Sequence, residues 1–433
     1  MTRAPSLLLV GGTDETVAKA RPLVERLLVL QHPTKVTPEQ ERLADVLTVV
    51  DYTDWNVTEP VVRRLRERPG FGAALSLTEP GLETAGRVID RYRLRGTGYQ
   101  VARRVRDKWD MRQHLAGRDP AAVAAAPLRQ RGDLAAFGDQ HGYPFIVKPT
   151  DATASIGVFR VDGPDRLDAI WAEVDRLRGT RTDRISSLFL LQEFLMEEYV
   201  DGPEYSVESF SFGGRHVIIT VTEKFTGPGH FAELGHAVPA RISGGDWGRL
   251  RDCARRFLDL MGVTDGVCHT EVRLSASGPK VIEGHTRLGG DAIPDLVEAA
   301  YGIDLTTLAL RWALDLPASL PDEPPARAGA CSRFLAGGPG TVESVDGAAA
   351  ARAAAGVITV RLTAKPGDVT RPLRDNWDRL GLIATTGPDT AAAIARGEDV
   401  IASTIKIRVA GPDGGTTLAR ATELGLARTG ASR

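Results

Sequence analysis

A predicted β-hairpin in the second half of the chain constrains fold and chemistry more than any other segment. Val267–Leu274 and Pro279–Thr286 have the alternating pattern of strands that are buried on one face. The residues between them, 275–278, read Ser-Ala-Ser-Gly and favour a turn. A hairpin that is symmetric about Ser277 then pairs the two strands in a defined register.

That register brings two carboxylates face to face. Glu271 lies opposite Glu283, with Cβ atoms ~4.5–5.5 Å apart. The opposite face carries Val272, Leu274 and Ile282, which suits a core. Two carboxylates this close repel unless a cation separates them or one is protonated, and Mg²⁺ is a natural resolution. The alternative is a solvated strand face with one protonated or splayed glutamate. A period of two places six polar side chains on the carboxylate face: His269, Glu271, Arg273, Glu283, His285 and Arg287.

Composition indicates a globular protein of several domains. A chain of 433 residues is too long for one ordinary core, so we expect about two to four domains. The net charge of −2 argues against nucleic-acid binding, and no apolar run reaches the ~18 residues of a membrane span. The first apolar run is too short for a signal peptide. Scattered cysteines at Cys253, Cys268 and Cys331 indicate a reducing cytoplasm without a disulfide or zinc framework.

Strands and helices alternate near the N-terminus. Strands are expected at Ser6–Val10, Val46–Val50 and Ala73–Leu77, with a helix from about Thr16 to Leu28. This alternation predicts a parallel α/β domain over residues 1–102, with ligand-binding loops at the carboxyl ends of the strands.

The middle of the chain mixes both element types. Helices are expected at Gln100–Ala116, Asp165–Arg178, Trp247–Met261 (capped by Gly262), Ala292–Tyr301 and Leu305–Leu314. Strands are expected at Pro144–Lys148, Phe189–Phe194, Glu204–Phe212 and His216–Glu223.

A Pro-rich run, Pro317–Gly329, predicts an exposed linker and the clearest domain boundary. A smaller β-rich unit follows it over residues 330–433. Its strands are expected at Val357–Leu362 and Ile401–Val409, and its helix at Thr390–Arg396.

Lys148 ends a buried strand and precedes a loop of small residues, Thr150–Gly157. An ammonium group and several backbone N–H groups at such a point can surround phosphate oxygens. The P-loop spacing is absent, and an ordinary surface loop is the alternative.

Two further acidic segments suggest ligand contacts. The strand–turn–strand run around Glu197 and Glu204 can offer backbone groups to an adenine edge and a carboxylate to ribose hydroxyls. Glu233 and His236 form an acid–imidazole pair that could hold a substrate amine, or could be a capped pair on the surface.

Arg287, just before Gly289-Gly290, suits an acyl phosphate or its tetrahedral successor.

In this order the segments resemble the ATP-grasp superfamily of carboxylate–amine ligases, over roughly residues 103–316. The residues that carry the resemblance are Asp107-Lys108 with Met111-Arg112, then FIVKPTDATASIGV, EEYVDGPEYSVE and TEVRL…KVIEGHTRLGGD. The pattern PGTV…GVITVRL…KPGD…RLGLIATTG is similar to the C-terminal lid of bacterial L-amino-acid ligases. The resemblance implies an α/β protein with an α+β core, divided at 1–102, 103–200, 201–316, 317–329 and 330–433.

The resemblance also implies residue roles. Lys108 and Lys148 would contact ATP phosphates beneath a mobile loop, and Glu271 and Glu283 would hold two Mg²⁺ ions. Glu233 and His236 fall where amino-acid ligases recognise substrate, and Arg287 with Gly289 and Gly290 would meet the acyl phosphate. The mobile-loop residues would be Ser155, Ile156 and Gly157, the adenine contacts Glu197, Tyr199 and Val200, and the ribose contact Glu204.

One position departs from the family pattern. Family members usually have Asn two residues after the second metal glutamate, where this chain has His285. An imidazole binds Mg²⁺ poorly and Mn²⁺ better, so Mn²⁺ is an alternative metal. His285 could instead hydrogen-bond a phosphate or contact the substrate.

The implied reaction joins a small carboxylate, such as an amino acid, to an amine through an acyl phosphate, with release of ADP and phosphate. Rivals are a ligase that charges a carrier-protein thiol, a biotin-carboxylase-like or glycinamide-ribonucleotide-like enzyme, and a non-catalytic nucleotide- or metal-binding protein. The C-terminal pattern that is similar to L-amino-acid ligases argues against the biotin-carboxylase-like and glycinamide-ribonucleotide-like enzymes. Many relatives are dimeric, so a homodimer is compatible with the resemblance. The expected binding partners are small-molecule substrates.

Overall fold

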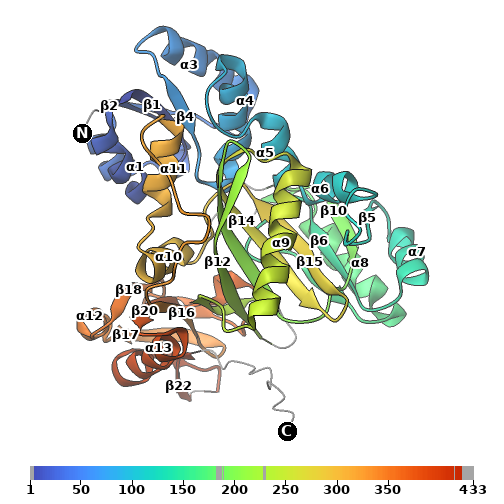
Figure 1. Ribbon diagram of the computed structural model, residues 1–433. Helices are drawn as coiled ribbons and strands as arrows, with labels where there is room; N and C mark the ends of the chain where they lie inside the picture. The colour runs from blue at the N-terminus through green and yellow to red at the C-terminus, as the bar shows by residue number, and fades with distance from the viewer. Residues whose placement is uncertain (1–3, 182–187, 189, 228–230, 414, 422–433) are drawn as a thin grey trace.

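The computed structural model describes residues 4–181, 188, 190–227, 231–413 and 415–421. Figure 1 shows an N-terminal unit and a C-terminal unit on either side of a large central sheet, with a smaller subdomain beside that sheet. One sheet is parallel and the others are antiparallel, which confirms the expected mixed α/β class.

The N-terminal unit is a parallel sheet of order β3-β2-β1-β4 flanked by helices. The helix expected to reach Leu28 is wrong beyond Ala20, because Val24–Gln31 forms a strand. Leu27 to Leu30 are fully buried in that strand, and an apolar run without alternation does not distinguish a central strand from a helix. The elements are β1 Ala4–Val10, α1 Asp14–Ala20, β2 Val24–Gln31, α2 Pro38–Leu43, β3 Val46–Val49, α3 Trp55–Glu67, β4 Ala73–Leu75 and α4 Leu82–Tyr92.

A smaller subdomain carries a four-stranded sheet of order β5-β10-β6-β7. The single helix expected over Gln100–Ala116 is two helices, because the Asp107 side chain caps a new helix by accepting from the Asp110 N–H. Phe189 lies outside the described residues, and the main strand of that region begins later, at Phe194. The elements are α5 Tyr99–Arg106, α6 Lys108–Leu115, β5 Ala125–Leu128, α7 Arg131–His141, β6 Phe145–Pro149, β7 Phe159–Val161, α8 Leu167–Leu177, β8 Thr180–Arg181, β9 Leu190–Leu191 and β10 Phe194–Glu198.

The central sheet has nine strands and extends into the C-terminal unit. Its order is β15-β14-β11-β12-β13-β16-β20-β18, and β23 also pairs with β16. Helix α9 packs on one face and helices α10 and α11 on the other. Gly262 caps α9 in the left-handed conformation, as expected. The central elements are β11 Glu204–Phe212, β12 Arg215–Thr226, β13 Glu233–Val238, α9 Gly244–Met261, β14 Asp265–Ser275, β15 Gly278–His285, α10 Ile293–Tyr301 and α11 Leu305–Ala313.

The opening hairpin is β14–β15, and its register is confirmed where the carboxylates lie. Glu271 pairs with Glu283 and His269 with His285. Next to Glu271 the register shifts by one residue, so Ile282 is an extra residue on β15. The prediction that Ile282 faces the core is therefore wrong: the bulge turns it toward the cavity described below, and Val281 takes the core position.

The C-terminal unit continues the central sheet and adds a second sheet of order β19-β17-β21-β22. The strand expected over Ile401–Val409 begins only at Lys406, because α13 continues to Thr404. Ile394, Val400 and Ile401 are buried with helical spacing. The elements are β16 Gly329–Ala336, β17 Gly340–Asp346, α12 Ala348–Ala353, β18 Val357–Leu362, β19 Val369–Thr370, β20 Gly381–Gly387, α13 Thr390–Thr404, β21 Lys406–Ala410, β22 Thr416–Leu418 and β23 Arg420–Ala421.

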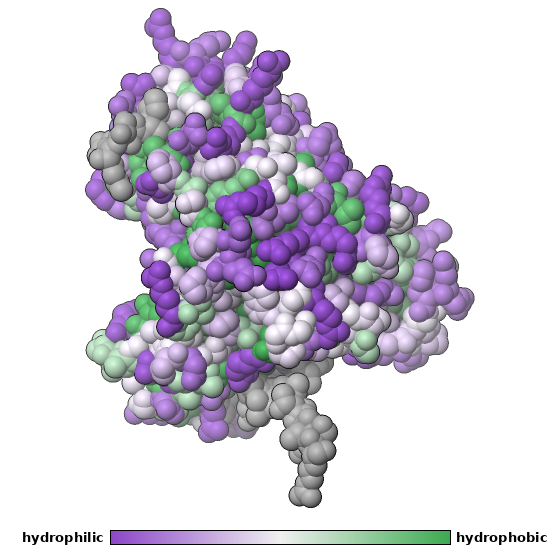
Figure 2. Space-filling model, in the orientation of Figure 1, coloured by the Kyte–Doolittle hydropathy of each residue, from purple (hydrophilic) through white to green (hydrophobic). Residues whose placement is uncertain are grey.

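The surface seen in Figure 2 is largely polar and charged, with apolar residues in smaller, separate patches. Among the described residues, no helix combines the length and apolar character that a bilayer crossing requires.

Candidate active site

A cavity of about 1260 Å³ lies where the N-terminal unit, the small subdomain, the central sheet and the C-terminal unit meet. All but one of the site residues expected from the sequence line it. The exception is Gly157, which has a left-handed φ of 68° and packs against the Pro149 ring. The expected residues that line the cavity are Lys108, Lys148, Ser155, Ile156, Glu197, Tyr199, Val200, Glu204, Glu233, His236, Glu271, Glu283, His285, Arg287, Gly289 and Gly290.

Two buried lysines converge on Glu283. Lys108 Nζ lies 3.3 Å from Glu283 Oε2, and Lys148 Nζ lies 3.6 Å from Glu283 Oε1. Burial opposes ionisation of this carboxyl, but the two lysines hold its pKa well below the usual range. The break between α5 and α6 brings Lys108 to this point, and the end of β6 brings Lys148. Paired ammonium groups of this kind can bind phosphate oxygens.

Glu197 and Arg112 form a buried support behind the lysines. Lys148 Nζ is 2.9 Å from Glu197 Oε2, and Arg112 donates to Glu197 Oε1 at 2.8 Å. Arg112 also donates to the carbonyls of Val281 and Ile282, at the bulge of β15. The Glu197 side chain thus orients Lys148, a role that the sequence did not indicate.

Lys224 is a buried centre of charge on β12 that sequence reasoning missed. Its ammonium lies 2.7 Å from Glu204, 2.8 Å from Glu233 and 2.9 Å from Glu271. Burial alone would lower its pKa, but the three carboxylates raise it well above the usual value. Little in the sequence signals this role, because Lys224 follows Glu223 in a strand that also contains Thr220 and Thr222. Arg273 also donates to Glu204, which leaves this carboxylate held from two sides.

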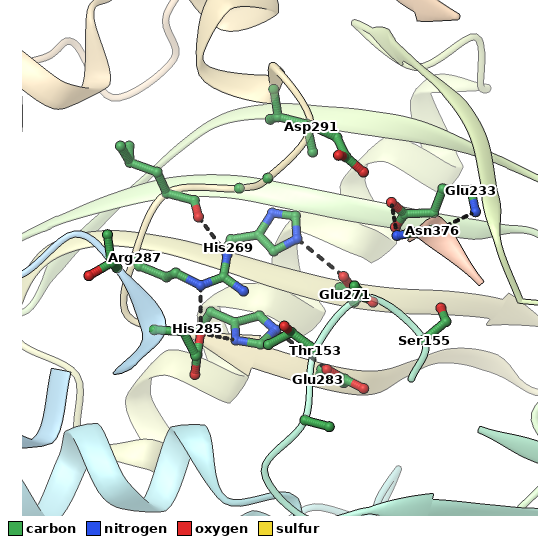
Figure 3. Close-up of a pocket in the computed structure, with 18 of the residues that line it drawn as sticks. Thr153, Ser155, Glu233, His269, Glu271, Glu283, His285, Arg287, Asp291 and Asn376 are labelled. Atoms are coloured by element: carbon green, nitrogen blue, oxygen red, sulfur yellow. Dashed lines mark hydrogen bonds and ion pairs between the residues drawn. The ribbon is translucent and has the colours of Figure 1, made fainter. Parts of the chain in front are cut away.

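The facing glutamates each contact an imidazole (Figure 3). His269 Nε2 lies 3.3 Å from Glu271 Oε1, and His285 Nε2 lies 3.4 Å from Glu283 Oε2. Burial opposes ionisation of Glu271, and Lys224 nevertheless lowers its pKa to about 2. Two ionised carboxylates on one side of the cavity, beside two lysines whose ammonium groups can bind phosphate oxygens, fit a divalent cation that can take phosphate oxygens as further ligands.

Each imidazole is held on its other side by a second buried carboxylate. His269 Nδ1 is 2.9 Å from Glu208, and His285 Nδ1 is 3.0 Å from Glu79. Burial would lower the pKa of His269, but Glu208 raises it to about 9. Gly289 is required here, because a Cβ on it would lie 2.9 Å from His269 Nδ1.

Glu79 comes from the N-terminal unit and also binds Arg287. The Arg287 Nε donates to Glu79, and Arg287 Nη1 donates to the Leu288 carbonyl at 2.6 Å. Although burial raises the pKa of Glu79, His285 and Arg287 together hold it well below the usual range. Glu79 was not expected from the sequence, because its partners lie about 200 residues away.

Residues of the C-terminal unit also line the cavity. Asn376 bonds twice to Glu233, accepting from its backbone N–H at 2.9 Å and donating to its carboxylate at 3.1 Å. Arg379 donates to both carboxylate oxygens of Asp291, at 2.8 and 2.9 Å. The segment that contains Asn376 and Arg379 was not expected to contribute to the site.

Glu233, His236 and Asp291 bring their ligand atoms within 4.8 Å of one another. Lys224 lies 2.8 Å from Glu233, and Arg379 lies 2.8 Å from Asp291, so each carboxylate of this group already has a cationic partner. His236 is buried, and its Nε2 lies 3.6 Å from Glu233 without a hydrogen-bond partner. This group is better suited to a substrate ammonium or hydroxyl than to a metal.

The sequence matches two known domain families. Residues 141–295 match the ATP-grasp domain, and residues 333–410 match the L-amino acid ligase C-terminal domain 2. Similar curated proteins include the uncharacterized protein y4rH of Sinorhizobium fredii, 26% identical over 344 residues, which are 79% of this chain and 70% of that protein. Another is human carnosine synthase 1, 28% identical over 210 residues, which are 48% of this chain and only 25% of that protein. The alanine–anticapsin ligase of Bacillus subtilis is 26% identical over 287 residues, 62% of this chain and 60% of that protein.

Among solved structures, the L-amino acid ligase from Bacillus licheniformis has a similar fold. It superposes with a TM-score of 0.79 at 20% identity, over 94% of this chain and 99% of that one. The family matches show that the chain contains an ATP-grasp domain. Its central ATP-grasp domain is followed by an L-amino acid ligase C-terminal domain.

Proposed function

We propose that this protein is an ATP-dependent ligase that joins a small carboxylate to an amine through an acyl phosphate. The observation that carries the proposal is a single cavity in which Lys108 and Lys148, Glu271 and Glu283, and Arg287 lie together. These are the groups that would bind triphosphate, divalent cation and acyl phosphate. Relatives named as alanine–anticapsin ligase and carnosine synthase 1 support an amide as the product.

Nucleotide would enter between the small subdomain and the central sheet. In this assignment Glu197, Tyr199 and Val200 lie near adenine, Glu204 holds ribose, and the loop with Ser155, Ile156 and Gly157 covers the phosphates. The Ser155 hydroxyl already reaches across the cavity to the Phe231 carbonyl, at 2.9 Å. Such a cover would exclude water, which otherwise hydrolyses an acyl phosphate.

The first step transfers the γ-phosphate of ATP to the substrate carboxylate. Glu271 and Glu283, with His285 as a further ligand, would hold a divalent cation, whose charge would offset the repulsion between the two anions. Lys108 and Lys148 lie beside Glu283 and would neutralise the transferred group. Glu197 and Arg112 keep Lys148 in place during this exchange.

The second step is attack of the amine on the acyl phosphate. Arg287 and the backbone N–H groups of Gly289 and Gly290 would stabilise the oxyanion that forms. Glu233 and His236 line the part of the cavity to which the C-terminal unit contributes Asn376. They would hold a substrate ammonium, and phosphate leaves as the amide bond forms.

The test is ATP-dependent phosphate release across a matrix of amino-acid pairs and other small carboxylates, with mass analysis of the products. The expected result is phosphate release that requires both an acid and an amine, with an amide of matching mass. Phosphate release that depends on a carrier-protein thiol, or none with any pair, would contradict the proposal.

Arg287→Ala is expected to lower kcat by about 10²–10³-fold while the affinity for ATP changes little, because the guanidinium acts on the oxyanion. Steady-state kinetics and ADP binding measure the two effects separately. Arg249→Ala is the matched control, because Arg249 is exposed on α9 and pairs only with Asp246 of the same helix among the described contacts. Equal losses of turnover and ATP affinity in Arg287→Ala would argue against this role.

A further inference from the structure

The carboxyl edge of the N-terminal sheet borders the cavity but has no role in the proposed function. In the order β3-β2-β1-β4, the strands β2 and β3 lie on one side of β1 and β4 lies on the other (Figure 1). Ligands of open α/β sheets commonly bind outside the carboxyl ends of the strands at such a switch point, which here lies between β1 and β4. Five residues at this edge line the cavity and are called the N-terminal wall below: Gly12, Gln31, Gln40, Tyr52 and Thr78.

Two glycines after β1 shape this wall. Gly11 and Gly12 have φ values of 69° and 126°, which L side chains rarely adopt. A Cβ on Gly11 would lie 2.8 Å from Thr78 Oγ1 and 2.9 Å from the Tyr52 hydroxyl, so the loops after β1 and β4 are in close contact. A Cβ on Gly12 would instead be 3.8 Å from Thr16, its nearest described neighbour apart from the residues on either side. The space in front of Gly12 therefore belongs to the cavity.

Two buried amides lie next to Gly12. Gln31, at the end of β2, donates from Nε2 to the Gly12 carbonyl and to Gln40 Oε1, at 3.1 Å in each case, and its own oxygen accepts from the His32 N–H. Gln40, on α2, is thus held by its oxygen. Among the contacts of the described residues, Gln40 Nε2 makes one long hydrogen bond, 3.4 Å to the Gly12 carbonyl. An amide NH₂ has two donors, so Gln40 keeps one for a ligand in the cavity.

The polar side chains of the N-terminal wall are neutral. Gln31, Gln40 and Tyr52 are all buried. Burial raises the pKa of Tyr52 to about 12, so its hydroxyl, which hydrogen-bonds Thr78, keeps its proton. An ionised ligand group next to these side chains would lack a counter-charge, whereas a carboxamide or hydroxyl group would find hydrogen-bond partners. The charged residues that line the cavity beside the wall, on the loop after β1 and near α2, are exposed: Asp14, Glu15 and Lys35.

The wall begins beside the reaction centre. Thr78 precedes Glu79, which binds both His285 and Arg287. Because Arg287 would stabilise the acyl phosphate, an acid activated there can extend from Arg287 along the wall. The cavity volume of about 1260 Å³ exceeds the ~300–1,000 Å³ typical of a pocket for one drug-sized ligand, so a nucleotide leaves room for such an acid.

We propose that the N-terminal wall binds the acid substrate beyond its reacting carboxylate, and that this part of the acid ends in a neutral carboxamide or hydroxyl group. Gln40 Nε2 would donate to the oxygen of that group, and the Tyr52 hydroxyl would be its second partner. The proposal deepens the proposed function and rests on it for the position of the acid at Arg287. It defines a substrate class, namely small acids with a neutral polar end as opposed to an apolar or ionised one.

The test is calorimetric binding of acids to the full chain with ADP and Mg²⁺ present, so that no reaction occurs. The acids form matched sets of similar chain length that end in a carboxamide, a hydroxyl, a carboxylate or a methyl group, such as glutamine, glutamate and norleucine. We expect the carboxamide or hydroxyl acid of a set to bind at least ~3-fold more tightly than the other two kinds, which is the effect of about one net hydrogen bond. This comparison uses the unchanged protein, so no folding defect can obscure it. A preference for the methyl or carboxylate acids, or no binding of any acid, would overturn the proposal.

Variants locate the preference at the wall. Gln40→Met should lower the affinity for the preferred acids by ~3–10-fold and leave the affinities for the methyl acids and for ADP unchanged. Because this change also takes an acceptor from Gln31, Tyr52→Phe is the second variant; it removes one hydroxyl and should act in the same direction. Gln140→Met is the matched control, since Gln140 is exposed on α7 and lies outside the residues that line the cavity. Variants that keep the full preference, or that lose ADP and all acids alike, would contradict the role of the wall.

The two proposals fail separately, because binding is measured without turnover. Phosphate release that requires an acid and an amine but shows no preference for neutral polar acids would support the ligase and contradict the role of the wall. A binding preference for neutral polar acids, without phosphate release for any acid–amine pair, would support the wall and contradict the ligase.

Discussion

We expect Glu283→Ala to lower the turnover of ATP-dependent amide formation by ~10³-fold or more, because Glu283 would hold the cation. The substitution removes a metal ligand and also leaves Lys108 and Lys148 without the carboxylate that lies 3.3 and 3.6 Å from them. Phosphate release at saturating ATP and metal measures the effect. Glu283→Gln should be equally inactive, because it keeps the shape of the side chain but loses the charge.

Glu173→Ala provides the matched control, since Glu173 is half-exposed on α8 and binds Arg176 of the same helix. Its activity should equal that of the unchanged protein. A Glu283→Ala protein that melts normally and keeps more than ~10% of the activity would remove Glu283 from the metal site.

Lys224→Met should have the largest effect on stability. The side chain is 2% exposed and holds Glu204, Glu233 and Glu271 within 2.9 Å, so its removal leaves three buried carboxylates short of a counter-charge. Removal of one partner from a buried ion pair typically costs ~3–5 kcal/mol. Urea titrations followed by circular dichroism should show a correspondingly lower midpoint.

Lys280→Met is the control for this effect. Lys280 lies 2.6 Å from Glu198, but both side chains are partly exposed, at 22% and 32%, so the expected loss is ~0–1 kcal/mol. Equal urea midpoints for the two lysine variants would contradict the prediction. They would mean that the three carboxylates take up protons when the lysine ammonium is lost, so that Lys224 is not essential for stability.

The sequence predicted the part of the site that follows from local periodicity. The pair Glu271 and Glu283 was found because alternation along two adjacent strands fixes which side chains face each other. Ile282 was misplaced because a bulge is a tertiary feature that leaves no clear pattern in the strand itself.

Residues that act through long-range contacts were missed. Glu79 meets His285 across 206 positions, and Asn376 meets Glu233 across 143. Glu79 follows an ordinary βα turn and Asn376 lies in a short 3₁₀ segment, so neither has a local signal of its role. The same limit explains β2, where burial on both faces removed the alternation that marks a strand.

The continuous nine-stranded sheet has a mechanical consequence. Strand β13 carries Glu233 and His236, and its residues 235–238 pair with residues 330–333 of β16 in the C-terminal unit. We therefore expect these two parts to move together, because a hinge within the sheet would break a row of backbone hydrogen bonds. Among the residues that the structure describes, the small sheet β5-β10-β6-β7 shares no strand with the central sheet. We therefore expect the small subdomain to be the part that moves when nucleotide enters. The central sheet, together with the C-terminal unit, would stay fixed.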